Sequence, residues 1–374
     1  MLKLDREKLN RNIETMLRKN IDDGLIFGAV CEVRQAGETV ARQSMGRYRF
    51  DTDEKPKGDS LFRFASMSKN IAGLSALQMI EKGKLNLDDR VSRYFPGFDK
   101  KAENPVLIRH LLTHTSGIVN PEGGWPEEVR TIQDAARFYE RELPLAFEPG
   151  TEWRYSASAA FDVLGSIIEM ICGMSYGEYI EKYITGPLGM KDTGFHPNSE
   201  QWSRMASVYL RDEDGNAYEP DDTKHCMMAG MPLSYESGGA NLAGTLDDYI
   251  KFADMLRNFG KGENGERIIT ERSARLLTIP LTPYGMKGMF TSNTAFSFAA
   301  RVFHDHPWMP EGAFGWNGLY GCQTFIDQTN GISAVIMKNG LVEAFTRLKG
   351  GDMSDEVCPD RFFEQAVYHS AVSS

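Results

Sequence analysis

Residues 61–84 read LFRFASMSKNIAGLSALQMIEKGK, and the fold prediction starts from this stretch. Phe62-Arg63-Phe64 predicts a short extended segment. Apolar residues then recur at a spacing that suits a helix buried on most sides, at Ile71, Leu74, Leu77, Met79 and Ile80. Lys82-Gly83-Lys84 predicts the end of this helix. The stretch therefore predicts a strand that runs directly into an interior helix.

Ser66 and Lys69 lie three residues apart at the start of this helix, in the only Ser-x-x-Lys sequence of the chain. Side chains at this spacing share a helix face, so the amine can reach the hydroxyl. Burial disfavours the ammonium and lowers its pKa, which makes Lys69 a candidate base for Ser66. An unpaired N–H group of the first turn is placed to hold an oxyanion. Chance supplies about one such four-residue match in a chain of this length, so the position of this match carries the prediction.

Composition narrows the class of protein. The chain has 374 residues, of which 41% are hydrophobic and 25% charged, as in soluble globular proteins of one or two domains. No run approaches the roughly 20 apolar residues that a membrane helix needs, so no membrane partner is expected. A net charge of −10 disfavours nucleic acid. The charged start of the chain (residues 1–6) and five scattered cysteines predict a cytoplasmic protein with free thiols.

Further elements are predicted on both sides of residues 61–84. They are a helix over residues 5–20, a hairpin of residues 25–34 and 39–48, a helix from Thr245, a hairpin of residues 324–327 and 332–338 with a turn at Asn330-Gly331, and a final helix from Arg361 to Val372. Residues 91–230 show helices and polar loops with few strands. We therefore expect an α+β fold, in which residues 1–90 and 231–374 form an antiparallel sheet flanked by helices and residues 91–230 form a mostly helical domain.

Two further segments contain candidate site residues. Tyr155 lies in a loop just before an apolar helix over Phe161 to Cys172, and a tyrosine hydroxyl beside a lysine can exchange protons with it. Taken alone, such a tyrosine is more often a packed aromatic with a hydrogen-bonded tip. Residues 315–321 read GWNGLYG, where the glycines permit a ligand to approach backbone N–H groups. Taken alone, this second segment is an ordinary turn with a core tryptophan.

Together, and in this order, the three segments resemble the serine β-lactamase/penicillin-binding-protein superfamily over about residues 10–340. The resemblance is closest to its class C-like branch, which includes family VIII carboxylesterases, D-aminopeptidases and acyltransferases. Further segments in the register of the family are residues 111–117, Pro149-Gly150, Tyr155-Ser156, residues 187–190 and Gly238-Gly239. For His114, within the first of these, the resemblance implies structural hydrogen bonding.

The resemblance implies a role for each matched residue. Ser66 would be the nucleophile, Lys69 its basic partner, and Tyr155 the group that passes the proton to the leaving group. The backbone N–H groups of Ser66 and Leu319 would form the oxyanion hole. No cofactor and no metal are implied. The substrate would be bound at Trp316, Asn317, Gly318, Gly238, Gly239 and Ala157.

Two departures from the family pattern bear on the substrate. The second motif is usually Tyr-x-Asn, and here Ala157 takes the place of the asparagine that hydrogen-bonds an amide substrate. Its loss removes roughly 1–3 kcal/mol from the binding of such an amide in a buried site. Trp316 stands where a lysine or histidine usually begins the third motif, and Trp-x-Gly is similar to the form in carboxylesterases and the statin-type acyltransferase. Both changes favour esters with apolar acyl groups.

The sequence thus predicts a serine hydrolase that cleaves small carboxylic esters through an acyl-enzyme on Ser66. The same site would act as an acyltransferase where an alcohol or amine outcompetes water. A β-lactamase or D-peptide hydrolase, and a non-catalytic acyl-binding sensor, stay open as alternatives, as does the oligomeric state. Gly173-Met174-Ser175-Tyr176-Gly177 fits the Gly-x-Ser-x-Gly of α/β-hydrolases, but we interpret it as a helix end followed by a capping box of Ser175 with Glu178.

Overall fold

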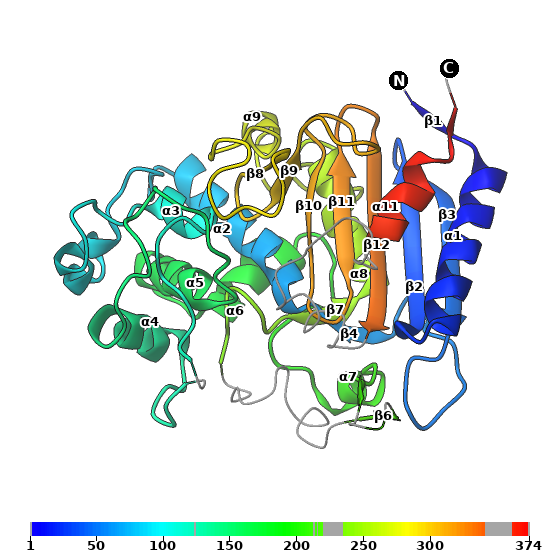
Figure 1. Ribbon diagram of the computed structural model, residues 1–374, viewed down its shortest axis with the longest axis horizontal. Coiled ribbons are helices and arrows are strands. Elements are labelled where there is room, and N and C mark those ends of the chain that lie inside the picture. Colours follow the sequence, from blue (N-terminus) through cyan, green and yellow to red (C-terminus); the bar gives the residue numbers. More distant parts are fainter. Residues whose placement is uncertain are drawn as a thin grey trace.

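The computed structural model describes residues 2–122, 125–211, 214, 216–219, 235–340 and 361–372. Within these residues the main sheet has seven antiparallel strands in the order β3-β2-β12-β11-β10-β9-β8 (Figure 1). The strands are β2 (Ile26–Gln35), β3 (Glu38–Gly46), β8 (Thr294–Phe296), β9 (Arg301–Phe303), β10 (Phe314–Asn317), β11 (Gln323–Asp327) and β12 (Ile332–Gly340). The predicted α+β class is confirmed, and the sheet is built from both ends of the chain.

The pairing of β2 with β12 joins the two predicted hairpins into one sheet. Val33 lies opposite Ala334, and Cys31 lies opposite Ile336. The turn between β11 and β12 contains Gly331, whose φ is +69°. Glycine adopts this left-handed conformation without steric cost, so the Asn-Gly signal in the sequence marked the hairpin correctly.

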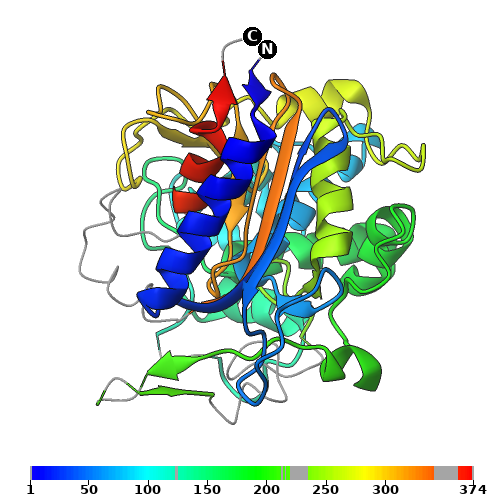
Figure 2. The ribbon, with the colours of Figure 1, turned by 90° about the vertical axis from the view of Figure 1, so that its right-hand side faces the viewer.

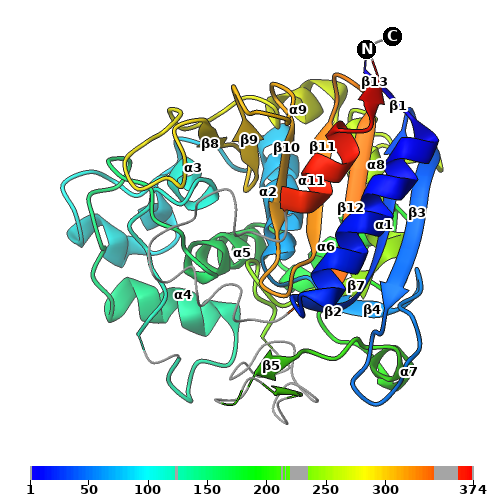
Figure 3. The same ribbon diagram turned by 45° about the vertical axis from the view of Figure 1, so that its right-hand side comes forward.

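Helices cover both faces of the sheet. On one face lie α1 (Arg6–Asp22) and α11 (Arg361–Tyr368), which cross β2 and β12 from the outside (Figure 3). On the other face lie α2 (Ser68–Glu81) and α8 (Leu246–Arg257). Because side chains alternate along a strand, Cys31 of β2 packs in the core on the side of α1 and α11, and Val30 packs in the core on the side of α2 and α8.

The core on the side of α2 and α8 continues from α2 into the helical region. All residues of α2 from Ser68 to Met79 are buried, as expected for a helix between two layers. The other elements are α3 (Ile108–Leu112), α4 (Ile132–Arg141), α5 (Ala159–Cys172), α6 (Tyr176–Ile180), α7 (Ser199–Ser203), α9 (Glu271–Leu276), the strand pair β4 (Leu61–Arg63) with β7 (Ala243–Thr245), and the pair β5 (Leu210–Arg211) with β6 (Ala217–Tyr218). No single described helix is long and apolar enough to cross a membrane, although α5 and residues 176–185 together pass that test as a pair bent by 75°.

The C-terminal helix is shorter than the sequence predicted. It ends at Tyr368, and Ala371–Val372 form β13, which pairs with β1 (Lys3–Leu4) and brings the two ends of the chain side by side (Figure 2). The N–H of Asp5 also donates to the carbonyl of Ser370 over 3.0 Å. This pairing with the chain start gives residues 371–372 strand partners in place of a further helical turn.

The Gly173–Gly177 segment has the local structure predicted for it. α5 ends at Cys172, and Gly173 follows in the left-handed conformation at φ 70°. Ser175 and Glu178 form a capping box at the start of α6. A nucleophile elbow needs a strand before the serine, so this serine is structural.

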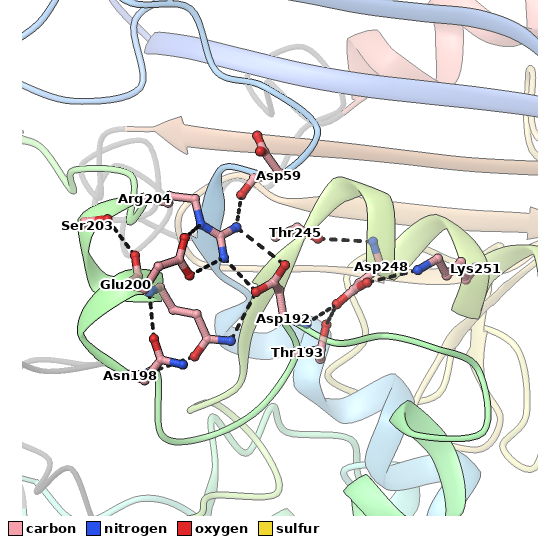
Figure 4. A network of polar contacts seen from close by, with 11 residues as sticks. Asp59, Asp192, Thr193, Asn198, Glu200, Ser203, Arg204, Thr245, Asp248 and Lys251 are labelled. Atoms are coloured by element: carbon pink, nitrogen blue, oxygen red, sulfur yellow. Dashed lines mark hydrogen bonds and ion pairs between the residues drawn. The ribbon is translucent and has the colours of Figure 1, made fainter.

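A cluster of ion pairs holds the strand that leads to Ser66 (Figure 4). Arg204 donates to Asp192 and Glu200 and to the carbonyl of Asp59. The backbone carbonyl of Arg204 accepts the N–H of Leu61, the first residue of β4, over 2.9 Å. The cluster therefore fixes the start of β4.

Candidate active site

Ser66 lies in a tight turn between β4 and α2. β4 ends at Arg63, and the turn Ala65–Met67 is a 3-10 helix that passes directly into α2 at Ser68. The prediction that Ser66 itself begins the α-helix is wrong by two residues. The reason is the backbone of Ala65, whose φ of +45° is rare for a residue with a side chain and turns the chain sharply before the serine.

Three predicted catalytic side chains meet at this turn. The hydroxyl oxygens of Ser66 and Tyr155 lie 2.6 Å apart, and the amine of Lys69 lies 3.1 Å from Ser66 Oγ. Lys69 is fully buried, whereas Ser66 and Tyr155 are each half-buried. A substrate can therefore approach the serine oxygen while the amine stays out of water.

The three polar partners of Lys69 can all be satisfied when the amine is neutral. Besides Ser66 Oγ, its Nζ contacts the backbone carbonyls of Ala157 and Gly239, the latter at 2.8 Å. A neutral amine has two N–H donors, one for each carbonyl, and one lone pair, which is left for the Ser66 hydroxyl. Burial lowers the pKa of Lys69, while Tyr155 and Asp162 act to raise it.

His114 accepts hydrogen bonds from the residues directly before and directly after Tyr155. Its carbonyl accepts the N–H of Arg154, and its Nδ1 accepts the N–H of Ser156, each over 3.0 Å. Burial, and secondarily Lys69, lower the pKa of His114 well below its ordinary value, so the ring is neutral and Nδ1 is free to accept. The structural hydrogen bonding predicted for His114 is present, and it holds the loop that carries Tyr155.

The predicted oxyanion donors come from two adjacent segments. Leu319 follows Gly318 in the turn after β10, and it packs with Ala65 in one apolar cluster. A Cβ on Gly318 would lie 2.2 Å from the carbonyl oxygen of Phe64, so only glycine allows this approach. Within the described part of the chain, the N–H groups of Ser66 and Leu319 have no hydrogen-bond partner. Both are free to donate to a substrate.

Trp316 belongs to an apolar wall beside Tyr155. The two rings lie 5.7 Å apart between centroids. The wall, as the name is used below, consists of Trp153, Met286, Met289, Phe290, Phe296 and Trp316. Asn317, the last residue of β10, pairs with Gln323 of β11 at the edge of this wall. The sequence drew attention to Trp316 but missed the residues from the loop at 286–290, which are far away along the chain.

Three of the predicted substrate-binding residues use their backbone to contact either the amine of Lys69 or the helix α5. The carbonyls of Ala157 and Gly239 accept from Lys69, and Gly238 packs against the carbonyl of Phe161. The methyl group of Ala157 is exposed next to Tyr155, where it can also meet a ligand. Substrate contact at the two glycines stays a prediction.

Sequence reasoning also missed Asp162, which is fully buried in the first turn of α5. It accepts from the hydroxyls of Ser237 and Tyr235 over 2.6 and 3.0 Å. An acid flanked by Phe161 and Val163 in an apolar run was a usable signal, because carboxylates are seldom buried without partners.

The α+β fold and the Ser66–Lys69–Tyr155 arrangement define a serine hydrolase. Residues 11–352 match the family model described as Beta-lactamase, and the chain belongs to that family. It is 27% identical over 383 residues to "Esterase EstB" of Burkholderia gladioli, covering 92% of this chain and 93% of the relative.

Two solved structures share the fold over nearly the whole chain. EstCE1, a hydrolase with promiscuous acyltransferase activity, superposes with a TM-score of 0.77 at 26% identity, and the match covers 97% of this chain and 99% of EstCE1. A family VIII carboxylesterase has a TM-score of 0.77 at 21% identity, with 97% of each chain covered.

Proposed function

We propose that the protein hydrolyses carboxylic esters with an apolar acyl group through an acyl-enzyme on Ser66. The observation that carries this proposal is the buried amine of Lys69, which has two carbonyl acceptors and the Ser66 hydroxyl as its partners. Burial of this amine lowers its pKa and so favours the neutral form, which can take a proton from the serine. The similarity to EstB supports an ester as the substrate.

Acylation follows from the geometry of the three side chains. The Ser66 proton moves to Lys69 Nζ as Ser66 Oγ bonds to the acyl carbon, and the carbonyl electron pair moves onto its oxygen. The N–H groups of Ser66 and Leu319 hold this oxyanion. When the intermediate collapses, the C–O bond to the alcohol breaks, and the alkoxide takes the proton of the Tyr155 hydroxyl. The Lys69 ammonium then returns a proton to Tyr155, and the amine is neutral again.

Deacylation uses the same groups with water as the nucleophile. Water passes a proton to Tyr155 as Tyr155 passes its own to Lys69, and the water oxygen bonds to the acyl carbon. Ser66 Oγ leaves and recovers a proton from the same pair, which releases the acid. An alcohol in the place of water would give a new ester, so the similarity to EstCE1 supports acyl transfer as a second outcome at one site.

The wall supports the choice of acyl group. Its rings and thioethers offer dispersion contacts and present no charge, and Ala157 offers no side-chain partner to a substrate amide. The loop that contributes Met286, Met289 and Phe290 is fastened to the chain beside Tyr155, because the N–H of Trp153 donates to the carbonyl of Lys287 over 2.8 Å. The β-lactam and D-peptide alternative is therefore less favoured.

The experiment compares Ser66→Ala with Ser175→Ala on p-nitrophenyl esters. Ser66→Ala should abolish the burst of p-nitrophenol and the mass increase of the acyl-enzyme, while its circular dichroism stays that of the wild type. Ser175→Ala is the matched control, since it loses only a helix cap and should keep turnover. Turnover by Ser66→Ala, or nitrocefin hydrolysis faster than ester hydrolysis by the wild type, would refute the proposal. A permanent mass increase without turnover would identify the acyl-binding sensor instead.

The acyl preference is tested by Phe290→Ala. This change removes a ring from the wall, and kcat/KM for hexanoate relative to acetate should fall about tenfold. Phe50→Ala is the control, since Phe50 is 39% exposed and lies outside the wall. Equal ratios in the two variants would show that the wall does not bind the acyl chain.

A further inference from the structure

The proposal concerns Asp162, a buried carboxylate that the acylation steps above do not use. We propose that Asp162 is a positioning residue for Lys69: it holds the Gly239 carbonyl on the amine and supplies the negative charge opposite the ammonium that forms when Ser66 reacts. This inference rests on the proposed function and concerns the regulation of the base in that same site.

A continuous chain of hydrogen bonds connects Asp162 with Lys69. Ser237 Oγ donates to Asp162 Oδ1 over 2.6 Å and accepts the N–H of Gly239 over 3.2 Å. The carbonyl of Gly239 then accepts from Lys69 Nζ over 2.8 Å. Because a serine hydroxyl can donate and accept at once, the carboxylate positions Gly239 through its N–H, and the carbonyl of the same residue contacts the amine.

Close backbone packing keeps this chain of contacts rigid. A Cβ on Gly239 would lie 2.7 Å from Cα of Ser158, and one on Gly238 would lie 2.5 Å from the carbonyl oxygen of Phe161. The segment that carries Ser237 is thus pressed against the first turn of α5, which contains Asp162. Lys69 Nζ itself lies 5.2 Å from the centre of the Phe161 ring, next to Asp162 in the sequence.

The charge of Asp162 matters most when Lys69 becomes protonated. When Lys69 acts as the neutral base of the proposed reaction, acylation creates an ammonium in a buried region. A carboxylate nearby stabilises this cation only after the proton has moved, and such selective stabilisation lowers a barrier. The second donor to Asp162, the hydroxyl of Tyr235 at 3.0 Å, helps to keep the acid ionised in its buried position.

The groups that face Lys69 are few within the described residues. They are Ser66 from the turn before α2, Tyr155 from its loop, Asp162 from α5 and His114 from the segment after α3. His114 is neutral, as its lowered pKa requires. Asp162 is therefore the carboxylate among these groups that acts on the amine, and because burial raises its own pKa to about 6 it is ionised at neutral pH.

The test is the pH dependence of kcat/KM for a p-nitrophenyl ester. Asp162→Asn keeps the shape and removes the charge. The ammonium then loses its partner, so the pKa of Lys69 falls: kcat/KM should drop ten- to a hundredfold, and the acidic limb of the profile should move to lower pH. Glu169→Gln is the matched control, because Glu169 is a partly buried acid on the same helix with partners of its own, and it should keep the wild-type profile.

A second variant decides the question if Asp162→Asn does not fold. Ser237→Ala cuts the hydrogen-bond chain and keeps the carboxylate, and it should slow acylation severalfold. Ser166→Ala is its control, because Ser166 is a buried serine of α5 whose hydroxyl donates to the backbone carbonyl of Ile132. The proposal is overturned if Asp162→Asn loses activity with no movement of the acidic limb, or if Ser237→Ala acylates as fast as Ser166→Ala. A wild type without ester turnover would overturn the proposed function itself, which is a separate result.

Discussion

A methyl group on Gly318 should disable the proposed oxyanion hole while leaving the side chains of Ser66, Lys69 and Tyr155 in place. The Cβ of a Gly318→Ala variant would lie 2.2 Å from the carbonyl oxygen of Phe64, and such contacts do not occur below 3.0 Å. The turn after β10 must therefore move away from Phe64 by about 0.8 Å. The N–H of Leu319, the next residue, moves with it.

The magnitude follows from the distance that an oxyanion donor requires. Effective donors lie about 2.7–3.1 Å from the oxyanion, so a displacement of this size weakens one of the two bonds severely. Loss of one donor costs about 10²- to 10³-fold in kcat. We expect a fall of about 10²-fold, together with a loss of about 1–3 kcal/mol in the free energy of unfolding from overpacking.

The assay is stopped-flow release of p-nitrophenol from a butyrate ester, with thermal unfolding measured on the same samples. Leu319→Ala is one control, because it keeps the backbone N–H and should keep kcat. Gly194→Ala is the other, since a Cβ there meets no atom within 4 Å. A Gly318→Ala variant that is folded and turns over within threefold of the wild type would refute the assignment of Leu319.

Three further predictions concern the base, the loop and the fold. Lys69→Met should abolish acylation. Burial lowers the pKa of Lys69, so between that lowered pKa and the ordinary lysine pKa the folded wild type binds fewer protons than the unfolded chain. The free energy of unfolding of the wild type therefore rises with pH across this range. The stability of Lys69→Met relative to wild type, from urea unfolding at several pH values, should thus be greatest below the lowered pKa and shrink as pH rises; a constant difference would contradict this. His114→Phe leaves the buried N–H of Ser156 unpaired, so unfolding free energy should fall by about 1–3 kcal/mol and kcat by about tenfold, and a wild-type kcat would show that His114 does not position Tyr155. Arg204→Met breaks the ion pair with Asp192 and should cost about 2 kcal/mol in calorimetry with kcat unchanged; wild-type stability would contradict the role of that cluster.

Local patterns predicted the elements but not their neighbours. The hairpin of β11 and β12 was evident from Asn330-Gly331, because a two-residue turn signal between apolar runs is a local feature. β8 and β9 were not predicted, since each has three residues and such short runs carry no clear period. The end of α11 at Tyr368 depends on a pairing partner at the other terminus. No pattern within the helix itself records that partner.

The site divides in the same way. Ser66 and Lys69 were recognisable because their spacing of three residues acts within one helical turn. Tyr155 was a candidate from its place before an apolar helix, but its catalytic role, and Leu319 altogether, entered only through the resemblance to a family. The part of the wall from residues 286–290 was missed, because these residues reach Tyr155 through a loop that is fastened by the backbone of Trp153. Such a contact depends on the path of the chain and has no periodic signal.

The amino-acid order alone determined the strand and interior helix around Ser66, the two hairpins that build the sheet, and the pair of a serine with a buried lysine. These features arise from side-chain periodicity and from interactions within a few residues. Only the tertiary structure decided what surrounds the amine. The carbonyls of Ala157 and Gly239 come from segments 88 and 170 residues away along the chain. The carboxylate of Asp162 comes from a different helix. Desolvation and hydrogen bonding by distant segments govern whether Lys69 is a base, and those terms exist only once the chain has folded.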